Sequence, residues 1–468
     1  MKRKVLSNAT ATLVMLMLLQ SPAFSQKQYQ LSVKEAVELA LKQVNEIRNL
    51  EVDKKLQIAK NREITGQALP QINGTVNANH YFSIPVTFLP DFISPTIYDV
   101  LVKEGVNGST GPVTKPSNNN ELFPARFGVP WQASAGFSIQ QLLFQPDVFV
   151  GLQARDKALE FADYNIKVME DSIRTNVYRA YYSVLIAQKR RALLETTVTR
   201  LETLLHDQTE MYKNGFAEKL DLDKTQVSLN NLRTSMNQAQ NLVVIGNAAL
   251  KFSTGMNQKD SLLLTDTLSM EKVKADLLET DFRYEDRNEI KLLNSLVELQ
   301  NLNVKRYKLG RIPTISAFYN YSQNAQRQTF SFFSSKESWY TTSVVGFNLS
   351  VPIFTGLQQN RKIEQAELTV EKTRNNIQNL KQAIDLQIVS QLQVLKNALA
   401  NLDIQTRNME LSAQVYNSTK IKFEQGLGSS FEILQSVSSF DESQQNYFQA
   451  LFEAVVARIS YLRTLGKL

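Results

Sequence analysis

The chain has 468 residues, with 52 lysines and arginines, 45 aspartates and glutamates, two histidines and no cysteine. Without cysteine there are no disulfides, thiolate metal sites or cysteine nucleophiles. Three basic residues open the chain, which leaves 49 basic against 45 acidic residues elsewhere, and this balance argues against nucleic-acid binding. His80 and His206 lack metal-ligand spacing, and no nucleophile–base set or phosphate loop is seen, so we expect no enzyme, cofactor or metal site.

The N-terminus has the pattern of a bacterial secretory signal peptide. Lys2-Arg3-Lys4 precedes an apolar run over 5–19 and a small-residue site that ends at Ser25. An N-terminal membrane anchor is the weaker alternative, because the run is too short to span a bilayer. Residues 1–25 are therefore predicted to be removed as the chain leaves the cytoplasm.

The rest of the chain contains an internal duplication. Residues 45–72 recur at 288–315 without a gap, and each copy runs helix, then proline, then strand. Further pairings set Gly136 against Gly346, and residues 212–216 against 423–427. We predict a first repeat over 26–278, closing with a linker at 257–278, and a second over 279–468.

Each repeat is predicted to begin with a helix and a β-hairpin. Ser32 and Glu35 form a capping box for a helix that ends near Pro70. Apolar and polar residues then alternate in hairpins at about 71–145 and 314–353, which gives each strand one apolar and one polar face. Such strands are long enough to cross a bilayer, although a soluble sandwich shows the same alternation. The proline-rich stretch 85–130 is predicted to be an irregular loop.

Long helices follow at 152–250 and 361–464, and each pair reverses at a glycine, Gly215 or Gly426. Apolar residues recur at coiled-coil spacing in the second stretch: Ile363, Val370, Ile377, Ile384, Ile388, Leu392, Leu395, Leu399, Leu402 and Met409. The other faces are rich in Asn and Gln, which suits either a solvated helix surface or the lining of a water-filled lumen. The four predicted strands of one chain are too few to close a barrel, so strands in a membrane would require an oligomer.

The ordered motifs that carry a family resemblance span residues 31–466. They are Leu31-Ser-Val-Lys-Glu-Ala-Val-Glu-Leu-Ala-Leu41 with Asn45-Glu-Ile47, the helix-ending Pro70 and Pro313, Val351-Pro-Ile-Phe-Thr-Gly356, Tyr212-x-x-Gly215 with Leu220-Asp-Leu222, and Phe423-x-x-Gly426 with Phe431-Glu-Ile433. Together they resemble the TolC-type outer-membrane efflux channels.

The resemblance implies a mainly α chain with membrane β-barrel strands. Coiled-coil helical hairpins and two β-hairpins per chain would form a homotrimer with a twelve-stranded barrel in the outer membrane and an α-helical tunnel in the periplasm. It also implies a periplasmic adaptor and an inner-membrane transporter as partners, and no nucleic acid. The implied adaptor-docking tips are Tyr212, Gly215, Phe216, Phe423, Gly426 and Leu427.

The same resemblance suggests Asp221, Phe423 and Glu432 as gate residues. The sequence departs from the family pattern at four positions in and after the second tip. Phe423 replaces a tyrosine, Gly428 an arginine, and Glu432 and Gln435 the first and second of two ring aspartates. We therefore expect a gate that closes by the packing of Phe423 and Phe216, with a weaker carboxylate ring at Glu432.

Two other classes of function stay open at this point. A stand-alone porin or surface-binding channel would use the long 85–130 loop for an external partner, and a secreted coiled-coil scaffold would need both hairpins to be soluble sheets. The long helices favour the efflux channel over the porin. The substrate is not specified by the sequence, because a polar lumen is permissive.

Overall fold

A computed structural model describes residues 28–90, 93–115, 122–267 and 282–468. The predicted signal peptide and part of the predicted linker lie outside these residues. The chain divides into two compact units, which are described separately. Unit 1 comprises residues 1–59, 155–301 and 366–468, and unit 2 comprises 60–154 and 302–365. This division does not follow the repeats, whose boundaries stay a prediction.

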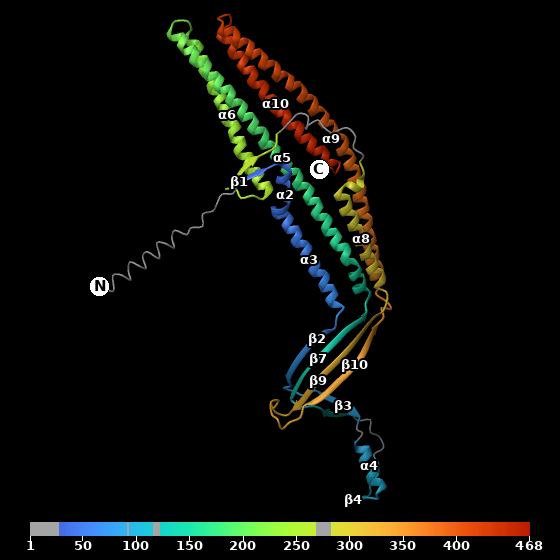
Figure 1. Ribbon diagram of the computed structural model, residues 1–468. Helices are drawn as coiled ribbons and strands as arrows, with labels where there is room; N and C mark the ends of the chain where they lie inside the picture. The colour runs from blue at the N-terminus through green and yellow to red at the C-terminus, as the bar shows by residue number, and fades with distance from the viewer. Residues whose placement is uncertain (1–27, 91–92, 116–121, 268–281) are drawn as a thin grey trace, which may run out of the picture. The chain divides into compact units, whose positions relative to one another are not determined.

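Helices dominate unit 1, and four of them also contribute residues to unit 2 (Figure 1). They are α2 (Val33–Gln43), α3 (Asn45–Gln67), α5 (Pro146–Lys213), α6 (Lys219–Thr254), α8 (Asn288–Leu309), α9 (Gln358–Glu424) and α10 (Ser430–Thr464). At ~1.5 Å per residue, α5 and α9 are each ~100 Å long. No helix of the described residues is both long and apolar enough to cross a membrane.

The predicted coiled-coil positions form the buried seam of α9. Ile384, Leu395 and Leu402 are almost wholly buried, and Ile363, Val370 and Ile377 are at most 8% exposed. Ile388, Leu392, Leu399 and Met409 pack at the margins of the core clusters. The seam therefore confirms the long helix expected from the spacing.

One predicted helix is interrupted. Instead of running from Ser32 to Pro70, it breaks at Val44, whose extended backbone (ψ 129°) separates α2 from α3. The predicted capping box is present, with Ser32 and Glu35 bonded in both directions. Just before α2, the short strand β1 (Gln28–Leu31) pairs in parallel with β8 (Ser261–Leu264), a contact that the sequence did not predict.

Unit 2 contains a four-stranded antiparallel sheet in the order β10-β9-β7-β2. Its strands are β2 (Gln71–His80), β7 (Trp131–Phe144), β9 (Thr314–Arg327) and β10 (Tyr340–Ser350). These are the strands of the two predicted hairpins, β2–β7 and β9–β10. The pairing of β7 with β9 joins the first hairpin to the second. The two repeats thus supply one continuous sheet.

The prediction of an irregular loop at 85–130 is wrong. The stretch contains a ribbon of β3 (Val86–Pro90) and β6 (Leu122–Arg126), the helix α4 (Ile93–Lys103), and the small hairpin of β4 (Asn107–Gly108) and β5 (Gly111–Pro112). Pro95 lies in the first turn of α4, where its missing N–H has no helical partner.

Candidate functional site: helical tips and sheet

The first helical tip is the turn between α5 and α6. Gly215 has φ +81°, and the Phe216 N–H donates to the carbonyl of Met211 at 2.8 Å. This bond and the Gly215 N–H bond to Tyr212 (3.0 Å) form the glycine cap in which a left-handed residue ends a helix. A side chain at Gly215 would be strained even though open space surrounds it.

The second tip repeats this geometry between α9 and α10. Gly426 has φ +74°, the Leu427 N–H donates to the Lys422 carbonyl at 2.9 Å, and the Gly426 N–H donates to Phe423 at 3.0 Å. A difference follows the turn. Ser429 caps α10 by accepting from the Glu432 N–H at 3.2 Å, whereas Glu218 makes no side-chain cap for α6.

Apolar side chains at both tips are exposed. Phe216 is 80% and Leu427 is 77% exposed, and one turn further Leu220 and Phe431 are also exposed. Phe423 differs, because it packs against the core cluster below the tip, while its counterpart Tyr212 is 43% exposed. The structure therefore places five of the six predicted tip residues at the surface and half-buries Phe423.

The carboxylates proposed for a gate occupy equivalent places in the two repeats. Asp221 and Glu432 each lie in the first turn of the returning helix, where a negative charge is favoured by the helix dipole. Glu432 is exposed and Asp221 is half-buried. Within the described ranges neither takes part in an ion pair. Phe423 does not lie beside Phe216 in any aromatic contact of the described rings.

A buried polar contact joins the two hairpins just below their tips. The Gln208 amide of α5 donates to the Ser430 hydroxyl of α10 at 3.1 Å, and both side chains are at least 94% buried. Around it, Leu201 and Leu204 of α5, Leu229 of α6, and Ile433 of α10 form one core. The sequence does not predict this pair, because a Gln and a Ser 222 residues apart carry no pairing signal.

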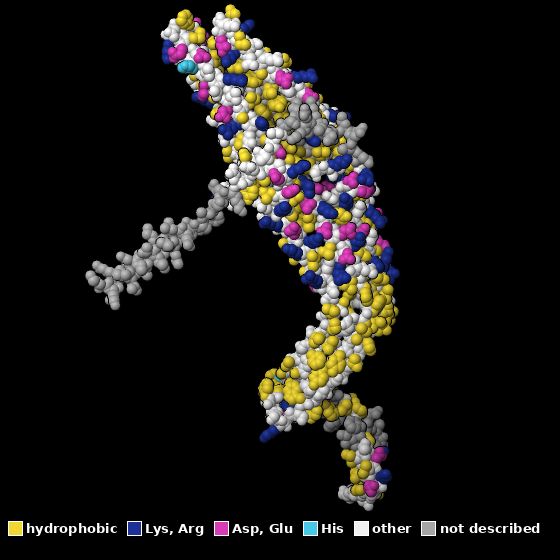
Figure 2. All heavy atoms as spheres, viewed as in Figure 1, with side chains coloured by type: hydrophobic (Ala, Val, Ile, Leu, Met, Phe, Trp, Pro, Cys, Tyr) yellow, Lys and Arg dark blue, Asp and Glu magenta, His cyan; other side chains and the backbone are white. Residues whose placement is uncertain are grey.

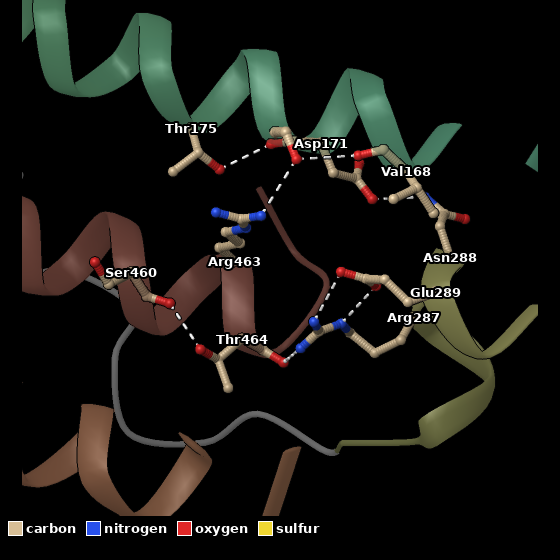
Figure 3. A network of polar contacts seen from close by, with 10 residues as sticks. Val168, Asp171, Thr175, Arg287, Asn288, Glu289, Ser460, Arg463 and Thr464 are labelled. Atoms are coloured by element: carbon tan, nitrogen blue, oxygen red, sulfur yellow. Dashed lines mark hydrogen bonds and ion pairs between the residues drawn. The ribbon is translucent and has the colours of Figure 1, made fainter. Parts of the chain in front are cut away.

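A second polar network lies where α8 begins (Figure 3). The Arg287 guanidinium is buried, donates to both oxygens of Glu289 at 3.0 and 3.1 Å, and donates to the Thr464 carbonyl at 2.6 Å. Asn288 donates to Asp171 of α5 at 2.7 Å. Burial alone would raise the pKa of Glu289, but the hydrogen bonds and charge of Arg287 lower it below its usual value. The network ties the second repeat's opening helix to α5 and to the end of α10.

Tyr181 plays the corresponding part beside α2. Its hydroxyl is fully buried with its ring, donates to the Leu31 carbonyl at 2.9 Å and accepts from the Asp266 N–H at 3.2 Å. Burial raises the pKa of Tyr181 to about 12, so the hydroxyl stays neutral at physiological pH. Tyr181 of α5 therefore holds the end of β1 and Asp266, two residues after β8.

The sheet of unit 2 has one apolar and one polar face. The register aligns Ile72, Ile139, Tyr319 and Val345 in one row, and Gly74, Phe137, Tyr321 and Ser343 in the next. The intervening row carries Asn73, Ser138, Asn320 and Val344 on the opposite face. Val76, Val345 and Phe347 are 74–82% exposed. Figure 2 shows hydrophobic side chains gathered over the sheet.

Aromatic rings cluster at the end of the sheet where β7 begins. Trp131 contacts His80 and Phe330, with ring centroids 4.2 and 5.0 Å away, and Phe332 contacts Trp339 at 6.1 Å. Arg327 is buried among them and pairs with Glu337. His80 is thus an aromatic packing partner, and His206 is exposed on α5. No group of three or more His, Asp or Glu side chains in the described part of the chain is arranged to hold a metal ion.

These features define a class of protein. Long helical hairpins with glycine tips, together with a sheet that has an apolar face and two open edges, are the parts of an outer-membrane channel subunit. Residues 297–467 match the family model described as outer membrane efflux protein. The outer membrane protein TolC of Vibrio cholerae serotype O1 is 18% identical over 339 residues, which are 72% of this chain and 77% of that protein.

Solved structures show the same fold. CusC aligns with a TM-score of 0.70 and 15% identity over 95% of this chain and 94% of its own. The CmeC outer membrane channel of Campylobacter jejuni aligns with a TM-score of 0.67 and 14% identity over 93% and 85%. Residues 297–467 thus match the outer membrane efflux protein family, and this match, the TolC relative and the shared fold identify an outer-membrane efflux channel.

Proposed function

We propose that three copies of this chain form the outlet of a tripartite efflux or secretion system. Their sheets would close into a twelve-stranded barrel, and their helices would form a tunnel that receives substrate from a periplasmic adaptor and an inner-membrane transporter. The channel performs no chemistry in this proposal. It supplies a path, and the transporter supplies the energy.

The observation that carries the proposal is the pair of open sheet edges. Within the described residues β2 and β10 each pair on one side only. Along their ten and eleven residues the outward-pointing N–H and C=O groups, which belong to alternate residues, have no partner in the described chain. Because each neighbouring pair in the sheet is antiparallel, β2 and β10 run in opposite directions, so β10 of one copy can pair with β2 of the next without a change of pattern. Within a bilayer, closure is the only way to satisfy these groups.

The tips support docking of an adaptor. Phe216 and Leu427 lie at the extreme turns, are more than three-quarters exposed, and have equivalent positions in the two repeats. A partner helix or hairpin that covers both would bury apolar area at two related places. This gives each subunit two similar docking points.

The absence of cysteine makes the barrel testable by pairing single cysteines on the edges. One cysteine on β2, at Asn73 or Thr75, is combined with one on β10 at Ser343, Val344 or Val345, and the cells are oxidised. We expect cross-linked products of two and three chains and none larger. Cysteines at Ser138 and Asn320, on the paired strands β7 and β9, serve as the control and should cross-link only within one chain. Absence of intermolecular products at every register would contradict the barrel.

Docking is tested by a photo-crosslinkable residue at Phe216 or Leu427. Capture of a periplasmic adaptor supports the tripartite system, and the adaptor's transporter narrows the substrate class. A matched control at Glu202, on α5 below the tip, should capture less. If both tips capture only other subunits in cells that express transporters, the stand-alone channel is the better account.

A further inference from the structure

The segment that joins β10 to α9 forms a small cavity at the base of the sheet. Its volume is about 240 Å³, and its lining includes Arg311, Ile353, Phe354, Leu357 and Asn360, all of unit 2. Ile353 is 94% and Phe354 is 81% exposed, so the chain itself does not cover the apolar wall. We propose that this cavity binds the headgroup of an anionic phospholipid from the periplasmic leaflet of the outer membrane, an inference that rests on the proposed barrel.

The apolar wall continues the membrane-facing side of the sheet. Val345, Phe347 and Leu349 lie on the apolar face of β10, and Val351 and Ile353 extend the same odd-numbered series beyond its end. The β9–β10 register pairs Leu349 with Ile315. Two further steps of that register bring Ile353 level with Arg311. The cavity therefore lies where the apolar face ends and the first basic side chain begins.

The polar wall is suited to a phosphate diester. Arg311 is exposed, and its Nη2 donates to the Asn360 amide oxygen at 2.6 Å, which orients the planar guanidinium. No carboxylate of the described residues pairs with Arg311, so its remaining donors are not engaged by an acidic side chain of the described chain. A guanidinium held in one orientation recognises two phosphate oxygens at once, which an ammonium group does not.

A side-chain hydrogen bond links the walls of the cavity. Gln359 at the start of α9 donates to the Tyr307 carbonyl near the end of α8. A side chain at Gly310 would meet the Gln359 side-chain amide nitrogen at 2.6 Å, so a larger residue there would displace this amide. The site is therefore formed by the protein before any ligand binds.

Charge at this end of the sheet favours an anionic lipid over a zwitterionic one. The parts of α8 and α9 within unit 2 carry Lys305, Arg306, Lys308, Arg361 and Lys362 against Glu364, besides the loop residue Arg311. One basic side chain at a lipid headgroup contributes about a fivefold preference for anionic lipid, and Arg311 is the basic residue that lines the cavity. The volume fits a phosphoglycerol headgroup, and the acyl chains would lie along Ile353 and Val351.

The first repeat provides an internal control. Ala68 stands where the second repeat has Arg311, counting two residues before Pro70 and Pro313. Phe144, which stands in the first repeat where the second has Phe354, contacts Phe149 with ring centroids 5.6 Å apart and is only 37% exposed. The first repeat thus closes its apolar corner on itself and lacks the guanidinium. We expect no lipid site at that position.

Quenching of a tryptophan tests the site. Phe354→Trp places a reporter in the cavity, and the parent protein, whose Trp131 and Trp339 lie at the other end of the strands, gives the background. The protein is reconstituted in phosphatidylethanolamine with brominated phosphatidylglycerol, or in phosphatidylglycerol-free bilayers with the same fraction of brominated phosphatidylethanolamine. We expect brominated phosphatidylglycerol to quench the tryptophan at position 354 about fivefold more strongly, per brominated lipid, than brominated phosphatidylethanolamine does.

Added variants separate the possible outcomes. Arg311→Ala should remove the preference, Arg311→Lys should retain part of it, and Lys336→Ala at the other end of the β9–β10 hairpin should leave it unchanged. Equal quenching by the two brominated lipids in the Phe354→Trp protein with Arg311 intact would overturn the lipid site. A second reporter, Val345→Trp, tests the barrel itself. If the tryptophan at position 345 is quenched and the one at position 354 shows no headgroup preference, only the lipid site is rejected. If neither tryptophan is quenched, both proposals are rejected.

Discussion

The returning helices α6 and α10 follow glycine turns of the same geometry and yet are buried to different extents. Counted with an offset of 211, they share one buried stripe: Thr225 with Ser436, Leu229 with Phe440, Leu232 with Ser443, Ala239 with Ala450, and Val243 with Ala454. Helix α10 has a second stripe that includes Val437, Leu451 and Val455, where α6 has Gln226, Gln240 and Val244. Val455 is 4% exposed and Val244 is 57% exposed.

The difference shows what each repeat packs against. Residues of both stripes enter cores that join the two hairpins, and the second stripe of α10 adds Leu451 and Val455, which lie in one cluster with Ile186 of α5. A similar divergence occurs where the repeats begin. Val44 precedes the aligned Asn45 and lies in an apolar core, whereas Arg287 precedes Asn288 and lies in a polar network. Equivalent backbone positions in the two repeats are thus held by apolar packing in the first and by a polar network in the second.

Replacing Arg287 by the first repeat's residue should have the largest effect. Arg287→Val would leave the half-buried Glu289 and the Thr464 carbonyl without their donor, and breaking a buried pair of this kind costs about 3–5 kcal/mol. Thermal or urea unfolding in detergent measures the loss. Arg283→Val is the control, because Arg283 is 71% exposed and its contact with Asp286 is 3.7 Å long. Equal losses for both variants would contradict the role of the network.

The matched valines test the second stripe. Val455→Ala removes two buried methyl groups and should cost about 2 kcal/mol of unfolding free energy, whereas Val244→Ala at the exposed position should change it by less than about 0.5 kcal/mol. Hydrogen exchange of α10 should rise in the first variant alone. If the assembled protein loses as much with Val244→Ala, another subunit covers α6 and the two helices are equally buried there.

The two tips differ in their caps. Ser429→Ala removes a side-chain cap and should destabilise the start of α10 by about 1 kcal/mol, while Glu218→Ser should add a cap to α6 and slow its exchange. Amide exchange over 214–225 and 425–436 reports both effects in one experiment. A Ser429→Ala variant with unchanged exchange would show that the turn alone fixes the helix start.

The equivalent carboxylates should differ in their effect on ions. Glu432 is exposed in the first turn of α10, so Glu432→Gln should reduce the cation preference of single channels and their block by divalent cations, if three copies surround the pore. Asp221→Asn, which neutralises the half-buried counterpart, should have a smaller effect. Bilayer recordings with unchanged selectivity and block in the Glu432 variant would reject the carboxylate ring.

The smallest effect is expected at Asp441, whose counterpart in α6 is Asn230. Burial raises the pKa of Asp441 above its ordinary 3.8, against the Gln445 hydrogen bond and the Arg190 charge. The folded state therefore favours the neutral acid. The resulting contribution to folding stability is fully present below the unfolded-state pKa and is lost as the pH rises through the folded-state pKa. Asp441→Asn should raise the melting temperature at pH 8, and the gain should shrink toward pH 4. A gain independent of pH would point to packing instead.

Sequence periodicity was sufficient for the elements that repeat a local pattern. The heptad spacing predicted the seam of α9, the alternation predicted the sheet faces, and Gly215 and Gly426 predicted the two turns. Contacts between distant residues had no such signal, which is why Gln208–Ser430, the Arg287 network and the β1–β8 pair were missed. The 85–130 insert was missed because its prolines and glycines indicate turns, although Pro95 is compatible with the first turn of α4. The roles of the tip residues stay predictions.

The open edges of the sheet have a consequence for biogenesis. A lone chain presents β2 and β10 as templates for any passing strand, and its exposed Val76, Val345 and Phe347 favour wrong partners. Since the correct partners are other copies, the yield of folded protein should depend on the rate of supply and on protection during transit to the membrane, and not on the free energy of one subunit. Overproduction without matching chaperone capacity should therefore give aggregates of an otherwise sound sequence.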